Sequence, residues 1–516
     1  MRVLFFALVC PLVAGSHVSG NEPDVIRVKE RSIPLGQLPT WETEAERRAL
    51  SSRPPRVTYV NDGLLPPPPA PGYRVPGEFE PVSAFMVSEG DWGNYGMMVD
   101  MINQGTSDGG AAAIVLTRRE VSSFESILVS GGVDLSRVIV MRPPGGLNAR
   151  WTRDFGPLSV YEPGPADENG PLAFVDLHYY DSRERDDAVT EYLAGEMGLS
   201  RYGLEGNDQT PVDEYKLYME GGNYMTDGRG TCILSDDVPD DNQNNPDANT
   251  YEKAEQILAE YLGCERIIWL TPVPSTSTSH VDLYAKLLTP DDILVIDMPD
   301  QTGNNGRVDE IVDDNADTLS MEGFNVHRVM IPSMGNWWTY KTYTNSVIIN
   351  QVVLVPTYSS APYDNDALDM YREILGGEYK VIGIDATAIA PLGGSVHCTT
   401  MQIASGCGDG ILSLLLEECD DDDLGGETCE SLGLEPGDLA CDEDCRIDTS
   451  PCGAEPEDPD GGSGADAGTD TDTDTDTKTE GDAGPNNSSE GWGSEGCGCR
   501  TTGRFHISLL PVLLSH

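Results

Sequence analysis

Leu392-Gly393-Gly394-Ser395-Val396-His397-Cys398-Thr399-Thr400 is a glycine-shaped turn that carries a single cysteine. It follows an extended, β-type run, Tyr379 to Asp385, and its two glycines allow the backbone to turn sharply just before the cysteine. Cys398 stands apart from six crowded cysteines that begin at Cys407. A thiolate is the strongest biological nucleophile near neutral pH, so Cys398 is a candidate nucleophile. The alternative is a buried or disulfide-bonded cysteine.

The composition of the 516-residue chain is strongly acidic. Its length allows two or three domains, and hydrophobic residues make up 38%, which is enough for a substantial core. The formal net charge of −55 argues against binding to nucleic acid or to anionic lipid. The same charge is compatible with cationic substrates, with calcium, or with solubility in a saline exterior.

Residues 1–20 have the pattern of a signal peptide, with Arg2 before the apolar run Val3 to Ala14. That run is too short to span a membrane, and no segment of residues 76–404 is a clear transmembrane helix. We therefore expect the protein to be secreted or held on the outer cell surface, where cysteines can be oxidised. Residues 21–75 are rich in proline and are predicted to be an irregular lead-in, or an arm that lies over the domain.

Residues 76–404 show an α/β pattern. Short apolar runs indicate strands at Ala112–Leu116, Val138–Met141, Ala173–Leu177, Arg266–Thr271, Ile293–Ile296, Val347–Pro356 and Tyr379–Ile384. Amphipathic stretches indicate helices at Trp92–Gln104, Glu120–Ser130, Asp187–Met197, Tyr251–Leu262, Arg307–Met321 and Ala367–Leu375. The alternation predicts repeated β-α-β units. It suits either a circular arrangement of small sheets around a central site or an open doubly wound sheet.

Residues 405–455 form a small acidic region with six cysteines: Cys407, Cys419, Cys429, Cys441, Cys445 and Cys452. We predict disulfides, because neither histidine nor CxxC spacing indicates a metal, but the spacing does not give the pairing. The acidic run Asp420 to Asp423 is either a calcium site or a solvated loop. Cys232 and Cys264 either pair with each other or stay buried and reduced. Residues 456–495, with Thr and Asp alternating from Thr469 to Thr477, read as a disordered linker, and residues 496–516 as a tail.

Four polar clusters upstream could join Cys398 in one site. They are Asn148 to Pro157, Met219 to Asn223, Ser279 to Asp282, and Tyr343 to Ser346. Since alternate residues of a strand face the same side, His280 and Asp282 on a strand would both face one cavity. His280 beside a thiolate can act as general acid and then as general base.

The carboxylates of Asp154 and Asp282 suit a guanidinium, which is planar, permanently charged and matched by carboxylates in pairs. Its carbon is a poor electrophile, so a strong nucleophile such as a thiolate is needed to attack it. A bound cation would also lower the pKa of the thiol. Each residue has an ordinary structural alternative, such as a turn aspartate, a solvated Glu220, a structural histidine, or an Asn345 that satisfies backbone groups.

Two other functions remain open from the residues alone. Cys398, His280 and Asn345 are also the residue types of a cysteine-protease catalytic triad, although two carboxylates that could bind a cation beside the nucleophile argue against that function. An acidic binding protein without catalysis is the non-enzyme alternative.

The clusters resemble those of the agmatine deiminase and Porphyromonas-type peptidylarginine deiminase family, within the guanidine-modifying superfamily. Trp-Thr-Arg-Asp-Phe-Gly-Pro, Glu-Gly-Gly-Asn, His-Val-Asp, Tyr-Thr-Asn-Ser and Gly-Gly-Ser-Val-His-Cys occur here in the family's order. The resemblance implies a five-bladed α/β propeller (pentein) over residues 76–404. It implies these residue roles: Cys398 as nucleophile, His280 as acid and base, Asp154 and Asp282 as guanidinium ligands, Glu220 as the group that orients His280, Asn345 beside the cysteine, and Trp151 as a substrate contact. It implies hydrolysis of a guanidinium through a thiouronium, without metal or cofactor.

The segment Tyr180 to Asp187 resembles the Arg-x-Arg segment of the peptidylarginine branch. There, Arg183 and Arg185 would bind the terminal carboxylate of a peptide that ends in arginine, whereas agmatine has no carboxylate. Ser277 departs from that branch, which tends to have an aromatic residue there. The alternatives are that Arg183 and Arg185 belong to a salt-bridged helix start and that the substrate is agmatine.

The end of the chain has a resemblance of its own. Cys407-Gly408-Asp409-Gly410 and Glu418-Cys419-Asp420 are similar to a cysteine-rich repeat of exported myxobacterial proteins. Gly496-Cys497-Gly498-Cys499-Arg500 is similar to a myxobacterial C-terminal sorting signal, although the usual long apolar helix and basic end are missing. The resemblance implies attachment to the outer cell surface.

Overall fold

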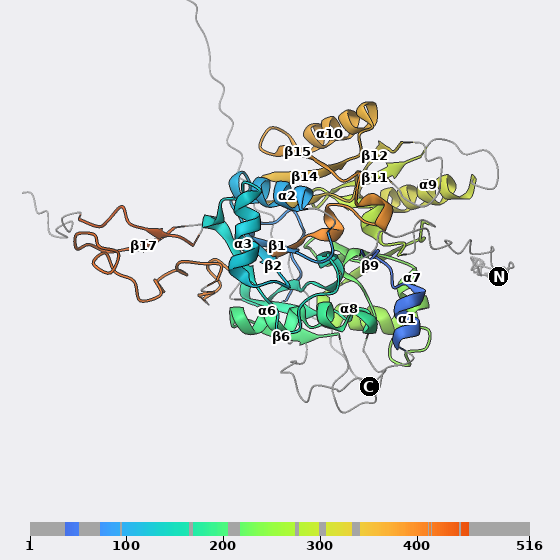
Figure 1. Ribbon diagram of the computed structural model, residues 1–516. Coiled ribbons are helices and arrows are strands. Elements are labelled where there is room, and N and C mark those ends of the chain that lie inside the picture. The colour runs from blue at the N-terminus through green and yellow to red at the C-terminus, as the bar shows by residue number, and fades with distance from the viewer. Residues whose placement is uncertain are drawn as a thin grey trace, which may run out of the picture. The chain divides into compact units, whose positions relative to one another are not determined.

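Figure 1 shows the computed structural model, which describes the part of the chain that carries the predicted site. The described residues are 37–50, 73–92, 95–164, 169–204, 217–273, 278–298, 306–332, 341–410, 412–413, 415–442 and 445–453. The predicted signal peptide, most of the lead-in, Ser277, the linker and the tail lie outside them. Among the described residues, no helix is long and apolar enough to cross a membrane.

Five small sheets follow one another between Val82 and Ala404 in the described residues. Their strands are β1 (Val82–Ser88), β2 (Ala112–Leu116), β3 (Val138–Met141) and β16 (Met401–Ala404); β4 (Leu158–Pro163), β5 (Asn169–Asp176) and β6 (Ser200–Gly203); β7 (Met225–Thr226), β8 (Thr231–Ser235) and β9 (Arg266–Leu270); β10 (Ala285–Leu287), β11 (Asp292–Asp297) and β12 (Asn325–Met330); and β13 (Val347–Ile349), β14 (Val352–Thr357) and β15 (Lys380–Asp385). Several small sheets therefore replace the single open sheet that the sequence left as an alternative.

Each sheet repeats one pairing scheme. A short strand runs antiparallel to the middle strand, which pairs in parallel with the next strand after a helical connection, as in β4, β5 and β6. The first sheet obtains its antiparallel strand from the far end of this region, because β16 pairs with β1. Residues that are more than 300 positions apart in the sequence are thereby joined, which brings the turn of Cys398 back to the first sheet.

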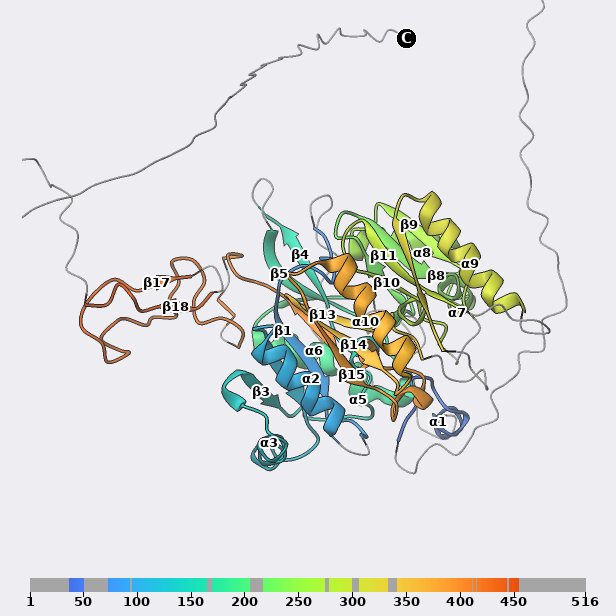
Figure 2. The same cartoon turned by 90° about the horizontal axis from the view of Figure 1, so that it is seen from above.

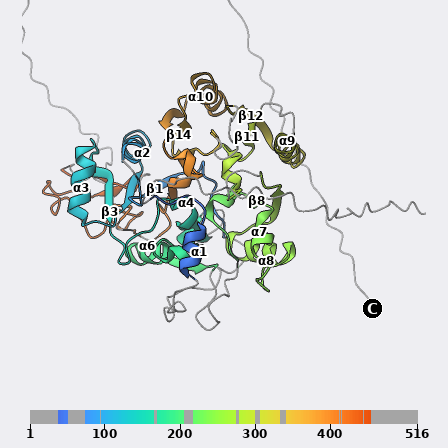
Figure 3. The same cartoon turned by 45° about the vertical axis from the view of Figure 1, so that its right-hand side comes forward.

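Helices connect the strands and cover the sheets. They are α1 (Glu44–Leu50), α2 (Gly96–Ser107), α3 (Val121–Ser130), α4 (Thr152–Phe155), α5 (Glu184–Asp187), α6 (Val189–Met197), α7 (Asp237–Asp241), α8 (Tyr251–Leu262), α9 (Gly306–Met321) and α10 (Ala361–Leu375). In Figure 3, α2, α6, α8, α9 and α10 lie toward the outside of the view, and the short α4 lies among the sheets. Figure 2 shows α9 and α10 from above, each beside strands of the sheet that it connects.

Helix α8 shows how local sequence sets these elements. The side chain of Thr250 accepts a hydrogen bond from Lys253 N and caps the first turn, and Gly263 ends the helix with a left-handed φ of 64°. One face buries Ala254, Ile257, Leu258, Tyr261 and Leu262. Cys264, just after the helix, forms a disulfide with Cys232 of β8, which settles a pairing that the sequence left open.

Three sequence predictions differ from the structure. The run Val347–Pro356 is not one strand but the hairpin of β13 and β14, because Asn350 adopts a left-handed φ of 51° and turns the chain. His280 and Asp282 do not lie on a strand: His280 precedes a single 3₁₀ turn, Val281–Leu283. The lead-in, which was predicted to be either irregular or an arm that lies over the domain, contains α1 and so is not irregular throughout its described part.

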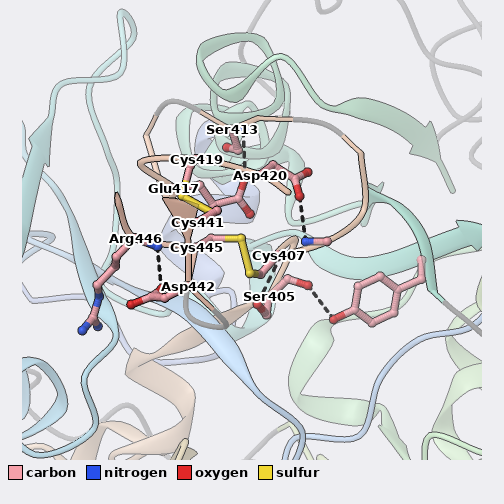
Figure 4. Close-up of a disulfide and its surroundings, with 12 residues drawn as sticks. Ser405, Cys407, Ser413, Glu417, Cys419, Asp420, Cys441, Asp442, Cys445 and Arg446 are labelled. Atoms are coloured by element: carbon pink, nitrogen blue, oxygen red, sulfur yellow. Dashed lines mark hydrogen bonds between the residues drawn. A yellow bond between two sulfur atoms is a disulfide. The ribbon is translucent and has the colours of Figure 1, made fainter. Parts of the chain in front are cut away.

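The cysteine-rich region is held by three disulfides, Cys407–Cys445, Cys419–Cys441 and Cys429–Cys452. Figure 4 shows the first two and the acidic residues around them. Asp420 accepts a hydrogen bond from Gly408 N at 2.8 Å, and its backbone pairs with that of Asp423. Across the described residues, no group of three or more His, Cys, Asp or Glu side chains is placed to hold a metal ion.

Candidate functional site

The turn that precedes Cys398 needs its glycines. Gly393 has a φ of 98°, and a Cβ there would lie 2.5 Å from Thr40 Oγ1. A Cβ at Gly394 would lie 2.7 Å from the ring of Trp151 and 2.8 Å from the Cβ of Cys398. The sequence interpretation of a sharp turn is therefore confirmed. Cys398 itself is buried and is the cysteine, among the described residues, that forms no disulfide.

The side-chain amide of Asn345 holds the cysteine in place. Its Nδ2 lies 3.2 Å from Cys398 Sγ, and its Oδ1 accepts hydrogen bonds from Ser395 N at 2.9 Å and Cys398 N at 3.4 Å. On another side, Cys398 Sγ lies 3.5 Å from Asp282 Oδ2 and can donate to it. The sulfur is therefore fixed between an amide donor and a carboxylate.

His280 lies between two carboxylates. Its Nε2 is 2.6 Å from Glu220 Oε2, and its Nδ1 is 3.5 Å from Asp154 Oδ1. Burial opposes a charge on the ring, but Glu220 and Asp154 outweigh it and raise the pKa of His280 to about 10. At neutral pH the ring is therefore an imidazolium that can give up a proton.

Three of these side chains converge on the backbone of Gly222, in the turn after Glu220. A Cβ added to Gly222 would lie 2.6 Å from His280 Nδ1, 2.8 Å from Asp154 Oδ1 and 3.2 Å from Asp282 Oδ2. Asp154 and Asp282, which are more than 120 positions apart in the sequence, thus lie together with His280 around one glycine. Only a glycine fits there without displacing them.

Several buried carboxylate oxygens in this space accept no hydrogen bond. Both Oδ atoms of Asp154, Oε1 of Glu220 and Oδ1 of Asp282 are buried and make no hydrogen bond to the described residues. Buried acceptors are nearly always satisfied, and a buried charge without a partner is costly. These oxygens therefore indicate the place of a cationic ligand with several N–H donors.

The electrostatics of the site suit a bound cation. Burial raises the pKa of Asp154 well above its usual value, and the charges of Glu220 and Asp282 add to this effect. Burial likewise raises the pKa of the Cys398 thiol, with Asp282 and Asp154 adding to it. A cation placed between the carboxylates would reverse both shifts, because it favours the ionised form of each group.

Comparison with known proteins identifies the family. A family model described as Porphyromonas-type peptidyl-arginine deiminase matches residues 102–404, more than half of the chain. The chain belongs to this family. Its members are deiminases, hydrolases that act on amidines.

Named relatives and solved structures agree with that placement. A provisionally named agmatine deiminase of Shewanella baltica (strain OS223) is 25% identical over 294 residues, covering 50% of this chain and 74% of the relative. Another, from Legionella pneumophila (strain Philadelphia 1), is 31% identical over 195 residues, covering 36% of this chain and 55% of the relative. A provisionally named arginine deiminase from Porphyromonas gingivalis has a TM-score of 0.54 at 22% identity, over 65% of this chain and 99% of that one. Agmatine deiminase of C. jejuni with substrate bound has a TM-score of 0.53 at 22% identity, over 65% and 97%. The structures show a shared, pentein-type fold.

Behind Asp282, the deiminase site contains a buried network that the sequence did not single out. His397 Nδ1 lies 2.7 Å from Asp282 Oδ2, and His397 Nε2 lies 2.7 Å from Glu78 Oε1. Glu78 also pairs with Lys286 and Arg153. Burial opposes the charge on Asp282, but the hydrogen bond from His397 holds its pKa below the usual value. Asp282 is therefore kept ionised and fixed in orientation.

The sequence held a signal for part of this network. His397 adjoins Cys398, and Arg153 adjoins Asp154, so both lie within quoted motifs. Glu78 carried no such signal, because it reaches His397 across 319 positions of the sequence.

The predicted substrate contacts have different surroundings in this deiminase. Trp151 is buried against Gly394, and its Nε1 donates to Leu38 O at 3.1 Å. Arg183 is fully buried and pairs with Glu46 at 3.0 Å. The side chain of Arg185 is exposed, and its backbone N donates to Asn148 Oδ1 at 3.1 Å. The structure thus places Trp151 at the turn of Cys398, and it surrounds Arg183 with protein groups.

Proposed function

We propose that this chain hydrolyses the guanidinium of arginine in peptides or proteins to a ureido group, with release of ammonia. The observation that carries the proposal is the set of buried carboxylate oxygens of Asp154, Asp282 and Glu220 that accept no hydrogen bond, beside the thiol of Cys398. A guanidinium has five N–H donors in a rigid fork and a permanent charge, so it suits such acceptors.

In the first half of the reaction, Asp154 and Asp282 hold the guanidinium with its carbon over Cys398. The bound cation lowers the pKa of the thiol, and the thiolate sulfur attacks the guanidinium carbon. His280 gives its proton to the departing nitrogen, so the C–N bond breaks and ammonia leaves. The product on the enzyme is a thiouronium on Cys398.

In the second half, His280 is the base. The neutral ring takes a proton from a water molecule, whose oxygen attacks the thiouronium carbon. The C–S bond then breaks and frees the ureido product and Cys398. Glu220 orients the ring through its contact with Nε2, and Asn345 holds the sulfur. The thiol proton passes to water before the attack and leaves with ammonia as ammonium, and the hydroxyl proton of the second intermediate returns to the sulfur as the C–S bond breaks. The sum is a guanidinium plus water giving a ureido group plus ammonium.

Agmatine is the second candidate substrate, and one contact favours it. Arg183, which would receive the carboxylate of a peptide ending in arginine, is already paired with Glu46. Agmatine has no carboxylate and needs no free arginine. Several relatives carry a provisional agmatine deiminase name, whereas the family description names peptidyl-arginine.

Two further parts of the proposal concern the arrangement of the sheets and the location of the protein in the cell. We propose that the five sheets are the blades of a five-bladed α/β propeller with Cys398 near its axis, supported by their repeated pairing scheme and by the joining of β16 to β1. We also propose that the protein is exported and attached to the outer cell surface through residues 496–516. Four disulfides in the described residues support an oxidising location.

The test is release of ammonia and of a ureido product by the full-length chain. Agmatine, free arginine and a peptide with C-terminal arginine are offered separately, and Cys398→Ala is the control. Turnover of the peptide that is lost in C398A supports the proposal. Turnover of agmatine alone would identify a small amine as the substrate. The absence of ammonia release from all three compounds would contradict the proposed function.

A further inference from the structure

Arg183 is saturated by one short segment near the start of the described chain. Its Nε and Nη2 lie 3.0 Å and 3.3 Å from the carboxylate of Glu46, and Nη2 also donates to Pro39 O at 3.0 Å and Trp41 O at 2.7 Å. Its Nη1 donates to Thr40 O and to the hydroxyl of Tyr179. All its donor directions are in use, so another carboxylate can bind only by displacing one of these acceptors, and Glu46 is the charged one among them.

The same segment lies against the turn of the nucleophile. Thr40 N donates to Leu392 O at 3.0 Å, and Leu38 O accepts from the indole of Trp151. Thr40 and Trp41 both lie within contact distance of a Cβ at Gly393. Cys398 and His280 are only 2% and 3% exposed in this arrangement. Residues 37–50, called the cap below, thus lie against the turn that carries Cys398.

The pair between Glu46 and Arg183 is the charged attachment of the cap and the one that holds its helix α1. In the described part of α1, Glu44, Ala45, Arg47, Arg48 and Ala49 are exposed, and Glu46 is the side chain that reaches inward. Burial opposes the charge of Glu46, but Arg183 holds its pKa below the usual value, so it is ionised at neutral pH. A short helix with little buried surface opens at low free-energy cost.

We propose that Glu46 is an internal carboxylate that occupies Arg183 in place of the substrate's terminal carboxylate, so that residues 37–50 act as a displaceable cap that sets selectivity between peptides and small amines. The proposal rests on the proposed deiminase function and names a residue that governs its substrate range. A peptide ending in a free carboxylate competes with Glu46 for Arg183. Its apparent affinity is reduced by the fraction of time that the cap is in place.

Glu46→Gln separates the charge from the structure of the cap. Glu46 caps its own helix, because its Oε2 accepts from Thr43 N and Thr43 Oγ1 at 2.8 Å each, and a glutamine can do the same. The substitution therefore keeps the helix start and removes the charge that opposes a substrate carboxylate. Glu44→Gln on the same helix is the matched control, because Glu44 pairs with Arg48 at the surface.

Binding is measured on the full chain with Cys398→Ala, with and without E46Q or E44Q, by calorimetry. The ligands are a short peptide with a free C-terminal arginine, the same peptide as its amide, and agmatine. We expect E46Q to lower the Kd of the free-acid peptide by about tenfold, which is the low end of the effect of a hydrogen bond to a charged group. The Kd values of the amide and of agmatine should stay within about twofold of those without E46Q. E44Q should change none of them.

Displacement of the cap has a second readout. Arg47 and Arg48 are exposed trypsin sites on α1. If the free-acid peptide removes Glu46 from Arg183, trypsin should cut after them faster when that peptide is present, and the amide should have no such effect.

Either of two results overturns the inference. One is an unchanged ratio of acid to amide affinity in E46Q. The other is an equal weakening of all three ligands, which would mean that Glu46 is a structural tie. Because these are binding measurements, they remain decisive when no ammonia is released from any compound, a result that would contradict the proposed reaction instead.

Discussion

Gly222→Ala should damage catalysis without unfolding the protein. The new Cβ would lie 2.6 Å from His280 Nδ1, whereas ordinary contacts begin at 3.4 Å. The ring of His280 therefore has to move by about 0.8 Å, together with the carboxylate of Asp154. A misplacement of about 1 Å costs on the order of a hundredfold in rate, or about 2.7 kcal/mol of activation free energy. Gly222 does not have a positive φ, so alanine adds no backbone strain.

The assay is steady-state ammonia release from the best substrate, with the melting temperature measured on the same samples. Gly195→Ala is the matched control: it lies within α6, and its Cβ would meet nothing within 4 Å. We expect G195A to keep wild-type turnover and to gain roughly 0.5–1 kcal/mol of stability. A folded G222A enzyme that turns over within threefold of wild type would refute the convergence of His280, Asp154 and Asp282 on one point.

Asp282→Asn should abolish turnover and yet make the thiol easier to ionise, because after burial the charge of Asp282 is the main influence that raises the pKa of Cys398. The midpoint of the pH dependence of alkylation by iodoacetamide should move to lower pH in D282N, and an upward move would contradict the assigned electrostatics. Cys232→Ala with Cys264→Ala opens a disulfide of sequence separation 32 and should lower the free energy of unfolding by about 3–4 kcal/mol in urea titrations. Replacement of both Cys429 and Cys452 in the cysteine-rich region by alanine should leave turnover unchanged. Loss of turnover in that variant would mean that the cysteine-rich region supports the catalytic site.

Elements with strong local signals were predictable from the sequence. The helix at Tyr251–Leu262 was predicted to the residue, because Thr250 and Gly263 mark its ends and its apolar residues recur on one face. The strand Ala112–Leu116 was also predicted to the residue, because it is a continuous apolar run that lies between two strands of its sheet. Short strands such as β7 and β10 carried no periodic signal and were missed, since pairing with neighbours creates them.

The site was predictable as a set of motifs but not as a geometry. Cys398, His280, Asp154, Asp282, Glu220 and Asn345 are brought together by the fold. What failed was the expected strand through His280, where a 3₁₀ turn places the ring instead. The partners Glu78 and Glu46 reach His397 and Arg183 across 319 and 137 positions, so no local pattern could reveal them.

The central claim, covalent catalysis by Cys398, is tested most directly by mass spectrometry of the full-length chain quenched during turnover. In the wild-type chain the account predicts a substrate adduct on Cys398 that adds the mass of the neutral substrate less ammonia, and His280→Asn, which lacks the acid of the first half as well as the base of the second, should form little of it. The adduct should be absent from C398A. Turnover that persists in C398A, or an adduct on any other residue, would contradict the account.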